Sequence, residues 1–180
     1  MNVNVAINPV YYPYLKDERR LQIYYGGSSS GKSFFLCQRI ILDLLEGKRN
    51  YLVIRNVMAT IRLSTFNELT KAILSMNVQN YFNINMSNLT ITCKLNNKQI
   101  MFYGCDQIEK VKSITPKDGV LTDIFIEEAT EVDYNSYKQL RKRLRGRSDV
   151  PKRVTMAFNP ILKTHWIYEE FFEKVWRDDE

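Results

Sequence analysis

Eight residues near the start of the chain have the types and the order of a phosphate-binding loop. Gly26 to Ser33 read GGSSSGKS and match the pattern G-x-x-x-x-G-K-[ST] at every defined position. The glycines Gly26 and Gly31 allow backbone conformations in which consecutive N–H groups point inward at phosphate oxygens. A helix that starts after the loop adds the partial positive charge of its N-terminus. The loop therefore predicts a binding site for a nucleoside triphosphate.

Each part of this loop has an expected role. Lys32 is expected to reach the β- and γ-phosphates and to support catalysis, and the hydroxyl of Ser33 is expected to ligate the Mg²⁺ ion that bridges them. The residues expected to surround the phosphates are Gly26, Gly27, Ser28, Ser29, Ser30, Gly31, Lys32 and Ser33. A glycine- and serine-rich turn without a ligand is the alternative, and the strand-like run before the loop and the helix-like run after it disfavour that alternative.

Two adjacent carboxylates end a later apolar run. Residues 120–128 read VLTDIFIEE, so Glu127 and Glu128 stand at the C-terminal end of an expected strand, where ligands of open α/β sheets bind. We assign Glu127 to the Mg²⁺ ion, which it would help to position through the water shell of the ion, and Glu128 to the attacking water as general base. Asp123 is a weaker competitor because it lies inside the strand. The alternative to a catalytic pair is an acidic, solvent-facing start of the next helix.

Strands must alternate with helices to bring these two motifs to one edge of a sheet. The expected strands are 21–25, 51–54, 81–84, 89–95, 99–103, 120–126 and 153–158, and the expected helices are 33–46, 59–76, 134–144 and 165–176. The Asn96-Asn97 pair suggests a hairpin turn. This order predicts one three-layer α/β domain with a mostly parallel sheet and antiparallel strands at one edge.

Composition narrows the classes of partner. The net charge of +6 fits a polyanion such as nucleic acid, although a phosphate site alone uses part of that charge.

The cysteines Cys37, Cys93 and Cys105 lie far apart without C-x-x-C spacing, so we expect reduced core residues and neither a disulfide framework nor a zinc site. His165 is the only histidine, and packing or capping beside Trp166 is expected rather than metal or acid-base chemistry. We expect a cytoplasmic protein, because no signal peptide or membrane span is recognisable.

Three motifs in this order, GGSSSGKS, IFIEEA and MAFNP followed by HWIYEEFF, resemble the ATPase half of phage large terminase subunits, which package double-stranded DNA into proheads. The similarity extends over nearly the whole chain and includes YYPYLKDERRLQIYYGG, EKVKSI and YKQLRKRLRGR. The resemblance implies a RecA-like ATPase fold of the additional-strand, catalytic-glutamate class. It also implies ATP and Mg²⁺ as cofactors, a single ATPase domain over residues 1–180, and a segment 1–20 that flanks the nucleotide.

The same resemblance implies partners and further site residues. The partners would be double-stranded DNA, a portal protein, a small terminase subunit and further copies of the chain in a ring, all in the host cytoplasm and with no membrane. Asn159 is expected to couple loss of the γ-phosphate to movement. Its hydroxyl-bearing neighbour is missing, because Ala157 stands where relatives often have Thr or Ser. Tyr11, Tyr12 and Tyr14 are candidates to stack on adenine, with core packing as the alternative.

The family pattern is broken inside the loop itself. Many relatives carry an arginine there that can act as an arginine finger, and this chain has Ser28, Ser29 and Ser30 instead. Since such a finger supplies roughly 10³- to 10⁵-fold in rate, we expect another cation to act, from a neighbouring subunit. The candidates are Arg141, Arg143, Arg145, Arg147 and Lys112. This basic cluster could instead contact DNA phosphates or form a solvated helix end.

Two other functions compete with a DNA motor. A small-molecule P-loop kinase fits the length, but nothing after Glu128 suggests an acceptor site or an arginine-rich lid. A non-hydrolysing, nucleotide-dependent assembly module is disfavoured by the presence of Lys32, Glu127 and Glu128. Full large terminases continue into an RNase H-like nuclease domain, which we do not expect here, so we predict no DNA cleavage by this polypeptide.

Overall fold

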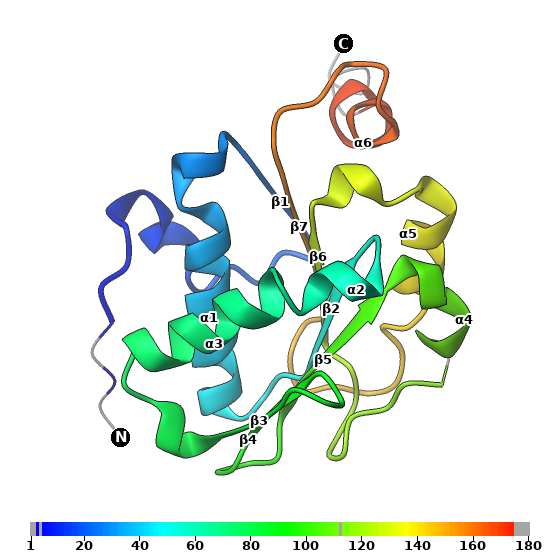
Figure 1. Cartoon of the computed structure of the whole chain (residues 1–180). Coiled ribbons are helices and arrows are strands. Elements are labelled where there is room, and N and C mark those ends of the chain that lie inside the picture. Colours follow the sequence, from blue (N-terminus) through cyan, green and yellow to red (C-terminus); the bar gives the residue numbers. More distant parts are fainter. Residues whose placement is uncertain (1–2, 4, 112, 175–180) are drawn as a thin grey trace.

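The computed structural model describes residues 3, 5–111 and 113–174, and these residues build one seven-stranded sheet (Figure 1). The strand order is β1-β7-β6-β2-β5-β4-β3. The parallel strands are β1 (Leu21–Tyr25), β7 (Arg153–Phe158), β6 (Asp123–Glu127), β2 (Tyr51–Arg55) and β5 (Gln99–Gly104), and the antiparallel ones are β4 (Thr90–Cys93) and β3 (Phe82–Asn85). The predicted mostly parallel sheet with antiparallel strands at one edge is confirmed.

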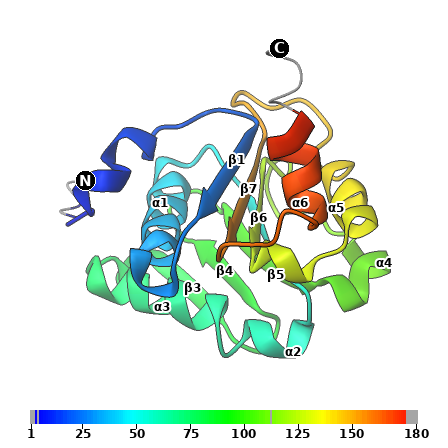
Figure 2. The same cartoon turned by 90° about the horizontal axis from the view of Figure 1, so that it is seen from above.

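Helices cover both faces of the sheet, as the view from above shows (Figure 2). On one face lie α1 (Lys32–Glu46) and α3 (Thr65–Ser75), and on the other lie α4 (Ile108–Val111), α5 (Tyr134–Arg141) and α6 (Trp166–Tyr168). Strand β2 shows why two cores form, because successive side chains of a strand point to opposite faces. Val53 belongs to the core under α1 and α3, and Leu52 and Ile54 belong to the core under α5. The predicted three-layer α/β architecture is confirmed.

The segment after β2 differs from its prediction. One helix over 59–76 is wrong, since α2 (Met58–Ile61) ends before Arg62 and α3 begins at Thr65. The backbone of Ser64 leaves the helical region (φ −109°, ψ −105°), and its hydroxyl donates to the carbonyl of Thr60 at 3.0 Å. Such local side-chain-to-backbone bonds compete with continuation of a helix.

Close approach of two backbones fixes the position of α2. A side chain on Gly104, at the end of β5, would bring its Cβ within 2.3 Å of the backbone nitrogen of Met58. Glycine is therefore needed at this position because the start of α2 lies directly on the end of β5. The segment between β2 and α3 is thus held against the same edge of the sheet at which the parallel strands end.

Several smaller expectations are also resolved. Asn97 adopts a left-handed conformation (φ 59°) in the turn between β4 and β5, so the hairpin is confirmed near the predicted place. Cys37 and Cys93 are buried, Cys105 is partly buried, and all three are free thiols. Burial raises the pKa of the Cys105 thiol to about 12. Across the described ranges, no helix is long and apolar enough to span a bilayer.

Candidate functional site

The phosphate loop leaves the end of β1 and leads directly into α1. The N–H of Gly26 donates to the carbonyl of Phe158 at 3.3 Å, so the loop starts beside the end of β7. Ser28–Ser30 form one 3-10 turn, and Gly31 then takes a left-handed conformation with φ 77°. A residue with a side chain rarely adopts that conformation, which explains the glycine. The loop thus has the tight turn and the helix start that anion binding requires.

The ammonium group of Lys32 lies inside this loop. Its side chain is largely enclosed, with the residue only 7% exposed, and Nζ donates to the carbonyls of Gly26 at 3.0 Å and Gly27 at 3.3 Å. A third bond joins Nζ to Oδ1 of Asn159 at 3.0 Å. Asn159 directly follows β7, so the predicted catalytic lysine and the predicted coupling residue are in contact although 127 positions separate them.

An N-terminal segment covers the loop. The hydroxyl of Tyr11 donates to the carbonyl of Ser30 at 2.9 Å, and the ring stacks on Phe35 with centroids 4.7 Å apart. Tyr14 is exposed and meets Tyr24 edge-on at 6.1 Å, and Tyr12 is 67% exposed. The three tyrosine candidates therefore differ: Tyr11 braces the loop, and Tyr12 presents its ring to solvent.

Glu127 ends β6 and is almost fully buried, with 6% of the residue exposed. Its Oε2 accepts a hydrogen bond from the hydroxyl of Thr65 on α3. Burial raises the pKa of the Glu127 carboxyl, and the Thr65 bond acts in the opposite direction. Glu68, one turn further along α3, also raises this pKa, whereas the charge of Arg55 lowers it.

Glu128 follows in a conformation that is unusual for a residue with a side chain. Its backbone is left-handed (φ 49°, ψ 52°), and it begins the turn Ala129–Glu131. That conformation costs roughly 1–2 kcal/mol for an L-residue, and such strain is concentrated at functional sites. The left-handed residue ends the strand geometry directly after Glu127, at the C-terminal edge of the sheet.

The turn after Glu128 is tied to the segment that follows Asn159. His165 places one ring nitrogen 3.0 Å from the carbonyl of Thr130, and Nε1 of Trp166 donates to the carbonyl of Val132 at 2.8 Å. The other nitrogen of His165 accepts from the N–H of Ile167 at 3.2 Å and so caps α6. The predicted capping and packing role of His165 is confirmed.

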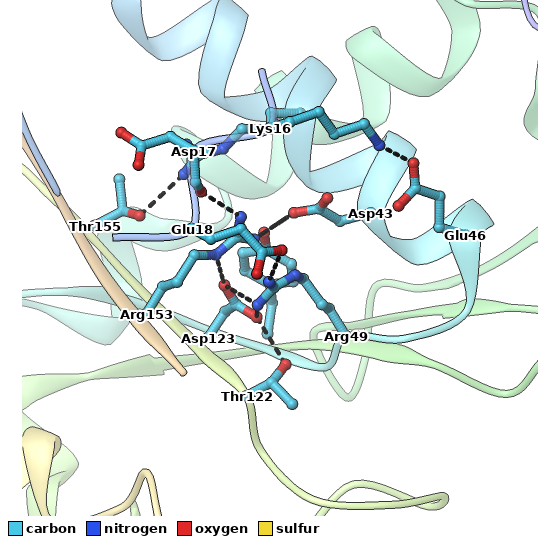
Figure 3. Close-up of polar contacts among 12 residues, drawn as sticks. Lys16, Asp17, Glu18, Asp43, Glu46, Arg49, Thr122, Asp123, Arg153 and Thr155 are labelled. Carbon is cyan, nitrogen blue, oxygen red and sulfur yellow. Dashed lines mark hydrogen bonds and ion pairs between the residues drawn. The ribbon is translucent and has the colours of Figure 1, made fainter. Parts of the chain in front are cut away.

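Asp123 lies at the other end of β6 from Glu127 and has a different environment (Figure 3). Its carboxylate accepts from Nε of Arg153 at 2.5 Å and from Nη1 of Arg49 at 3.1 Å. Nη2 of Arg153 donates to the carboxylate of Asp43 and to the hydroxyl oxygen of Tyr51. We call these five residues the ion network. Asp123 is thus no competitor for the catalytic role, because its charge is used in the interior of the fold.

The basic cluster has two parts. Nη2 of Arg143 donates to the carbonyl of Ile114 at 2.9 Å, so this partly buried side chain holds a neighbouring loop. The exposed members are Arg141, Arg145 and Arg147, and Lys112 lies outside the described residues. Arg141 also packs over the ring of Tyr137 at 5.5 Å.

Two adjoining hollows lie beside Arg141 and Arg147. One of about 720 Å³ is lined by Arg20, Asn135, Lys138, Gln139, Arg141 and Lys142. The next, of about 660 Å³, includes Arg20, Arg147 and Lys152. Arg20 precedes β1, and Arg147 and Lys152 precede β7, so this basic surface lies toward the N-terminal edge of the parallel strands, opposite the phosphate loop.

The sequence alone does not single out Thr65. A Ser-Thr pair inside an apolar helical pattern is the available signal, since both residues favour helix starts over helix interiors. Two residues could hold a metal ion, Ser33 and Glu127, because both carry oxygen donors. Such donors suit Mg²⁺, which proteins hold through one or two carboxylates together with substrate phosphates and water. Among the described residues, no group of three or more His, Cys, Asp or Glu side chains could hold a metal without such help.

Comparison with known proteins gives consistent matches. A family model described as phage terminase large subunit matches residues 18–180. The PBSX phage terminase large subunit of Bacillus subtilis (strain 168) is 34% identical over 167 residues, which are 92% of this chain and 37% of that protein. The terminase large subunit of Bacillus phage SPP1 is 28% identical over 151 residues, which are 81% of this chain and 36% of that protein.

Solved structures share the fold. The large terminase of a thermophilic bacteriophage gives a TM-score of 0.71 at 17% identity, over 91% of this chain and 39% of that one. The HK97 bacteriophage large terminase gives 0.67 at 13% identity, over 97% and 38%. The same thermophilic phage protein has also been solved in complex with ATP-γ-S and with ADP. This chain spans less than 40% of the length of each of these relatives.

Proposed function

Because this chain belongs to the phage terminase large subunit family, we propose that it is the ATP-hydrolysing unit of a motor that drives double-stranded DNA into proheads. One observation carries the proposal further than any other: Lys32 of the phosphate loop contacts Asn159 at the end of β7. A phosphate-binding residue and a residue of another strand end thus share one hydrogen bond. That contact gives a direct route from the nucleotide to the rest of the fold.

The nucleotide would bind to a phosphate loop that already has its turn and its helix start in place. The main-chain N–H groups from Gly26 to Gly31 and the start of α1 would hold the phosphates. Lys32 would exchange its carbonyl partners for phosphate oxygens. Mg²⁺, when bound, would neutralise the β- and γ-phosphates, with Ser33 and Glu127 as its protein ligands.

Hydrolysis would depend on Glu128. Its carboxylate would orient a water molecule and accept its proton as the water oxygen attacks the γ-phosphorus and the bond from that phosphorus to the β,γ-bridging oxygen breaks, with ADP as the leaving group. The strained backbone of Glu128 supports this role, since left-handed residues that carry side chains are concentrated at functional sites. Tyr12 and Tyr14 would stack on the base, and Tyr11 would brace the loop from the side of Ser30.

Coupling would begin at the Lys32–Asn159 bond. When phosphate oxygens compete for the ammonium group, Asn159 must find another partner, and when phosphate leaves, the bond re-forms. The two states of Asn159 would move the segment between β7 and α6. That segment is fastened to the turn after Glu128 by His165 and Trp166, so this turn would follow the change.

The exposed basic surface would act outside its own subunit. Arg141, Arg145 and Arg147 lie toward the edge opposite their own phosphate loop, so they suit either a neighbouring nucleotide in a ring or the phosphates of DNA. The further partners in the host cytoplasm would be the ring itself, a portal protein and a small terminase subunit.

Substitution of Arg141 and Arg147 by Ala separates action on a neighbouring nucleotide from contact with DNA. A finger lowers turnover at saturating ATP, and a DNA contact lowers the salt slope of DNA binding.

The decisive experiment is phosphate release measured against protein concentration, with and without duplex DNA. A superlinear rise that DNA increases is expected if subunits complete one another's sites. Lys71→Ala, an exposed lysine on α3, is the matched control for the arginine variants. Absence of ATP hydrolysis at every concentration, or stimulation by a small alcohol acceptor in place of DNA, would overturn the proposal.

A further inference from the structure

One contact to the acidic pair comes from outside the recognised motifs. Thr65 is the first residue of α3 and has no exposed surface. Its hydroxyl has one proton to donate, and that proton goes to Oε2 of Glu127. The adjacent Ser64 hydroxyl is 3.4 Å away and bonds instead to the carbonyl of Thr60. The donor of Thr65 is therefore used on Glu127 alone.

The surroundings of Glu127 make this bond important for orientation. A glutamate side chain has three rotatable bonds, so burial alone does not set the direction of its carboxylate. The charge of Glu68 raises the pKa of the Glu127 carboxyl and that of Arg55 lowers it, so neither partner acts alone on this group. The Thr65 hydroxyl is the hydrogen-bond donor that the structure gives to this carboxylate within the described residues.

The break between α2 and α3 is what makes the contact possible. In a continuous helix, Thr65 would lie in a helix interior, where a threonine hydroxyl bonds to the preceding turn. The non-helical backbone of Ser64 instead makes Thr65 the first residue of a new helix. The hydroxyl can then reach across to the end of β6, 62 positions further along the chain.

We propose that Thr65 is a positioning residue of the hydrolytic site, whose hydroxyl holds the Glu127 carboxylate in the orientation that receives the nucleotide-bound metal ion. The inference rests on the proposed function, since Glu127 is a metal ligand only if the chain binds metal and nucleotide. It adds α3 to the site, a helix that packs against α1 in one core and so connects the metal ligand to the helix that carries Ser33.

The experiment compares Thr65→Val, Thr65→Ser and Thr70→Val. Thr70 lies on the same helix, and its hydroxyl donates only to the carbonyl of Phe66, at 2.9 Å. Free Mn²⁺ is counted by electron paramagnetic resonance as it is titrated into protein with a non-hydrolysable ATP analogue. A fluorescent ATP analogue in EDTA reports metal-free nucleotide affinity, and thermal melting reports folding.

Thr65→Val is expected to weaken Mn²⁺ binding roughly 10-fold, because groups that orient a metal ligand typically control 10- to 100-fold in affinity. Metal-free nucleotide affinity should stay within about 2-fold, and Thr65→Ser and Thr70→Val should bind Mn²⁺ like the unmodified chain. In a Glu127→Gln background, Thr65→Val should have no further effect.

Unchanged Mn²⁺ affinity in folded Thr65→Val, or an equal loss in Thr70→Val, would overturn the inference and leave the proposed function intact. If Thr65→Val does not fold, the decision passes to Thr65→Ser, since loss of Mn²⁺ affinity with the hydroxyl retained would overturn it. An unmodified chain that binds the analogue equally well with and without Mn²⁺ would overturn both proposals.

Discussion

Strand β6 carries a buried acid at each end, and the two ends are built in opposite ways. At its start, Asp123 bonds to the guanidinium groups of Arg153 and Arg49. At its end, Glu127 bonds to a neutral hydroxyl, and Lys32 nearby bonds to carbonyls and an amide. In the ion network each charge is satisfied by an opposite charge. In the phosphate-loop site the hydrogen-bond partners are neutral.

This difference separates a structural cluster from a reactive one. Buried ions that pair with each other are fixed, because losing one partner strands the other in a medium of low dielectric constant. Buried ions with neutral partners keep their charge available for a ligand of opposite sign. This suits the proposed roles of Lys32 toward phosphate and of Glu127 toward a cation, whereas Asp123 could bind a cation only by losing its bonds to Arg153 and Arg49.

The largest effect is expected for Lys32→Ala, which removes the cation of the phosphate-loop site. ATP turnover should fall at least ~10²-fold, because the charge that stabilises the transferring phosphoryl group is lost. Phosphate release measures the change, and an unaltered melting temperature shows that the fold persists. Turnover at the unmodified rate would refute the assignment of the loop.

Glu128→Gln tests the second charge of that site without altering its shape. The variant should bind ATP with nearly unchanged affinity, while hydrolysis falls roughly 10²- to 10⁴-fold through loss of the general base. Fluorescent-nucleotide binding and single-turnover hydrolysis give the two quantities. Normal hydrolysis would place the base on another residue.

Asp123→Asn tests the ion network in the same way and should give the opposite pattern. Removing one charge leaves Arg153 and Arg49 buried with less compensation, so the free energy of unfolding should fall by about 3–5 kcal/mol. Nucleotide affinity of the folded fraction should be unchanged. Urea denaturation and nucleotide binding provide both values, and a variant of full stability that has lost ATP binding would contradict the distinction between the two ends.

The smallest effect is expected at the periphery of the ion network. Glu46 pairs with Lys16, and both side chains are largely in water. Glu46→Gln should change the free energy of unfolding by less than about 1 kcal/mol, because exposed pairs are screened and lose side-chain entropy. A loss as large as that of Asp123→Asn would show that burial is not what distinguishes the two pairs.

Local sequence patterns were sufficient for much of the fold. Strand β7 has the predicted bounds, and the glycine loop stands between a strand and a helix as predicted, because both features depend on neighbours in the chain. The break at Ser64 could not be predicted in this way. The apolar pattern continues across it, and the contact that uses the break is made with Glu127, far along the chain.

In the candidate site, too, features that depend on adjacent residues were predictable and contacts between distant residues were not. The loop and the acidic pair follow from adjacent residues, and their roles remain predictions. The partners that define each environment are remote: Asn159 for Lys32, Thr65 for Glu127, and Arg153 for Asp123. No spacing rule relates such positions. The place of Asp123 inside the strand ranked it below Glu127, and the folded chain adds the bonds that separate the two environments.

Strand β7 is hydrogen-bonded along its length on both sides, to β1 and to β6, so it cannot slide without disrupting the sheet. Any displacement that begins at Asn159 must therefore leave through the short connection to α6. His165 and Trp166 bond that connection to the turn beyond Glu128, so the segments that follow β7 and β6 are joined to each other. If Asn159 acts as proposed, the length of this connection sets how far a displacement is carried, and residues inserted there should allow ATP hydrolysis to continue without the coupled movement.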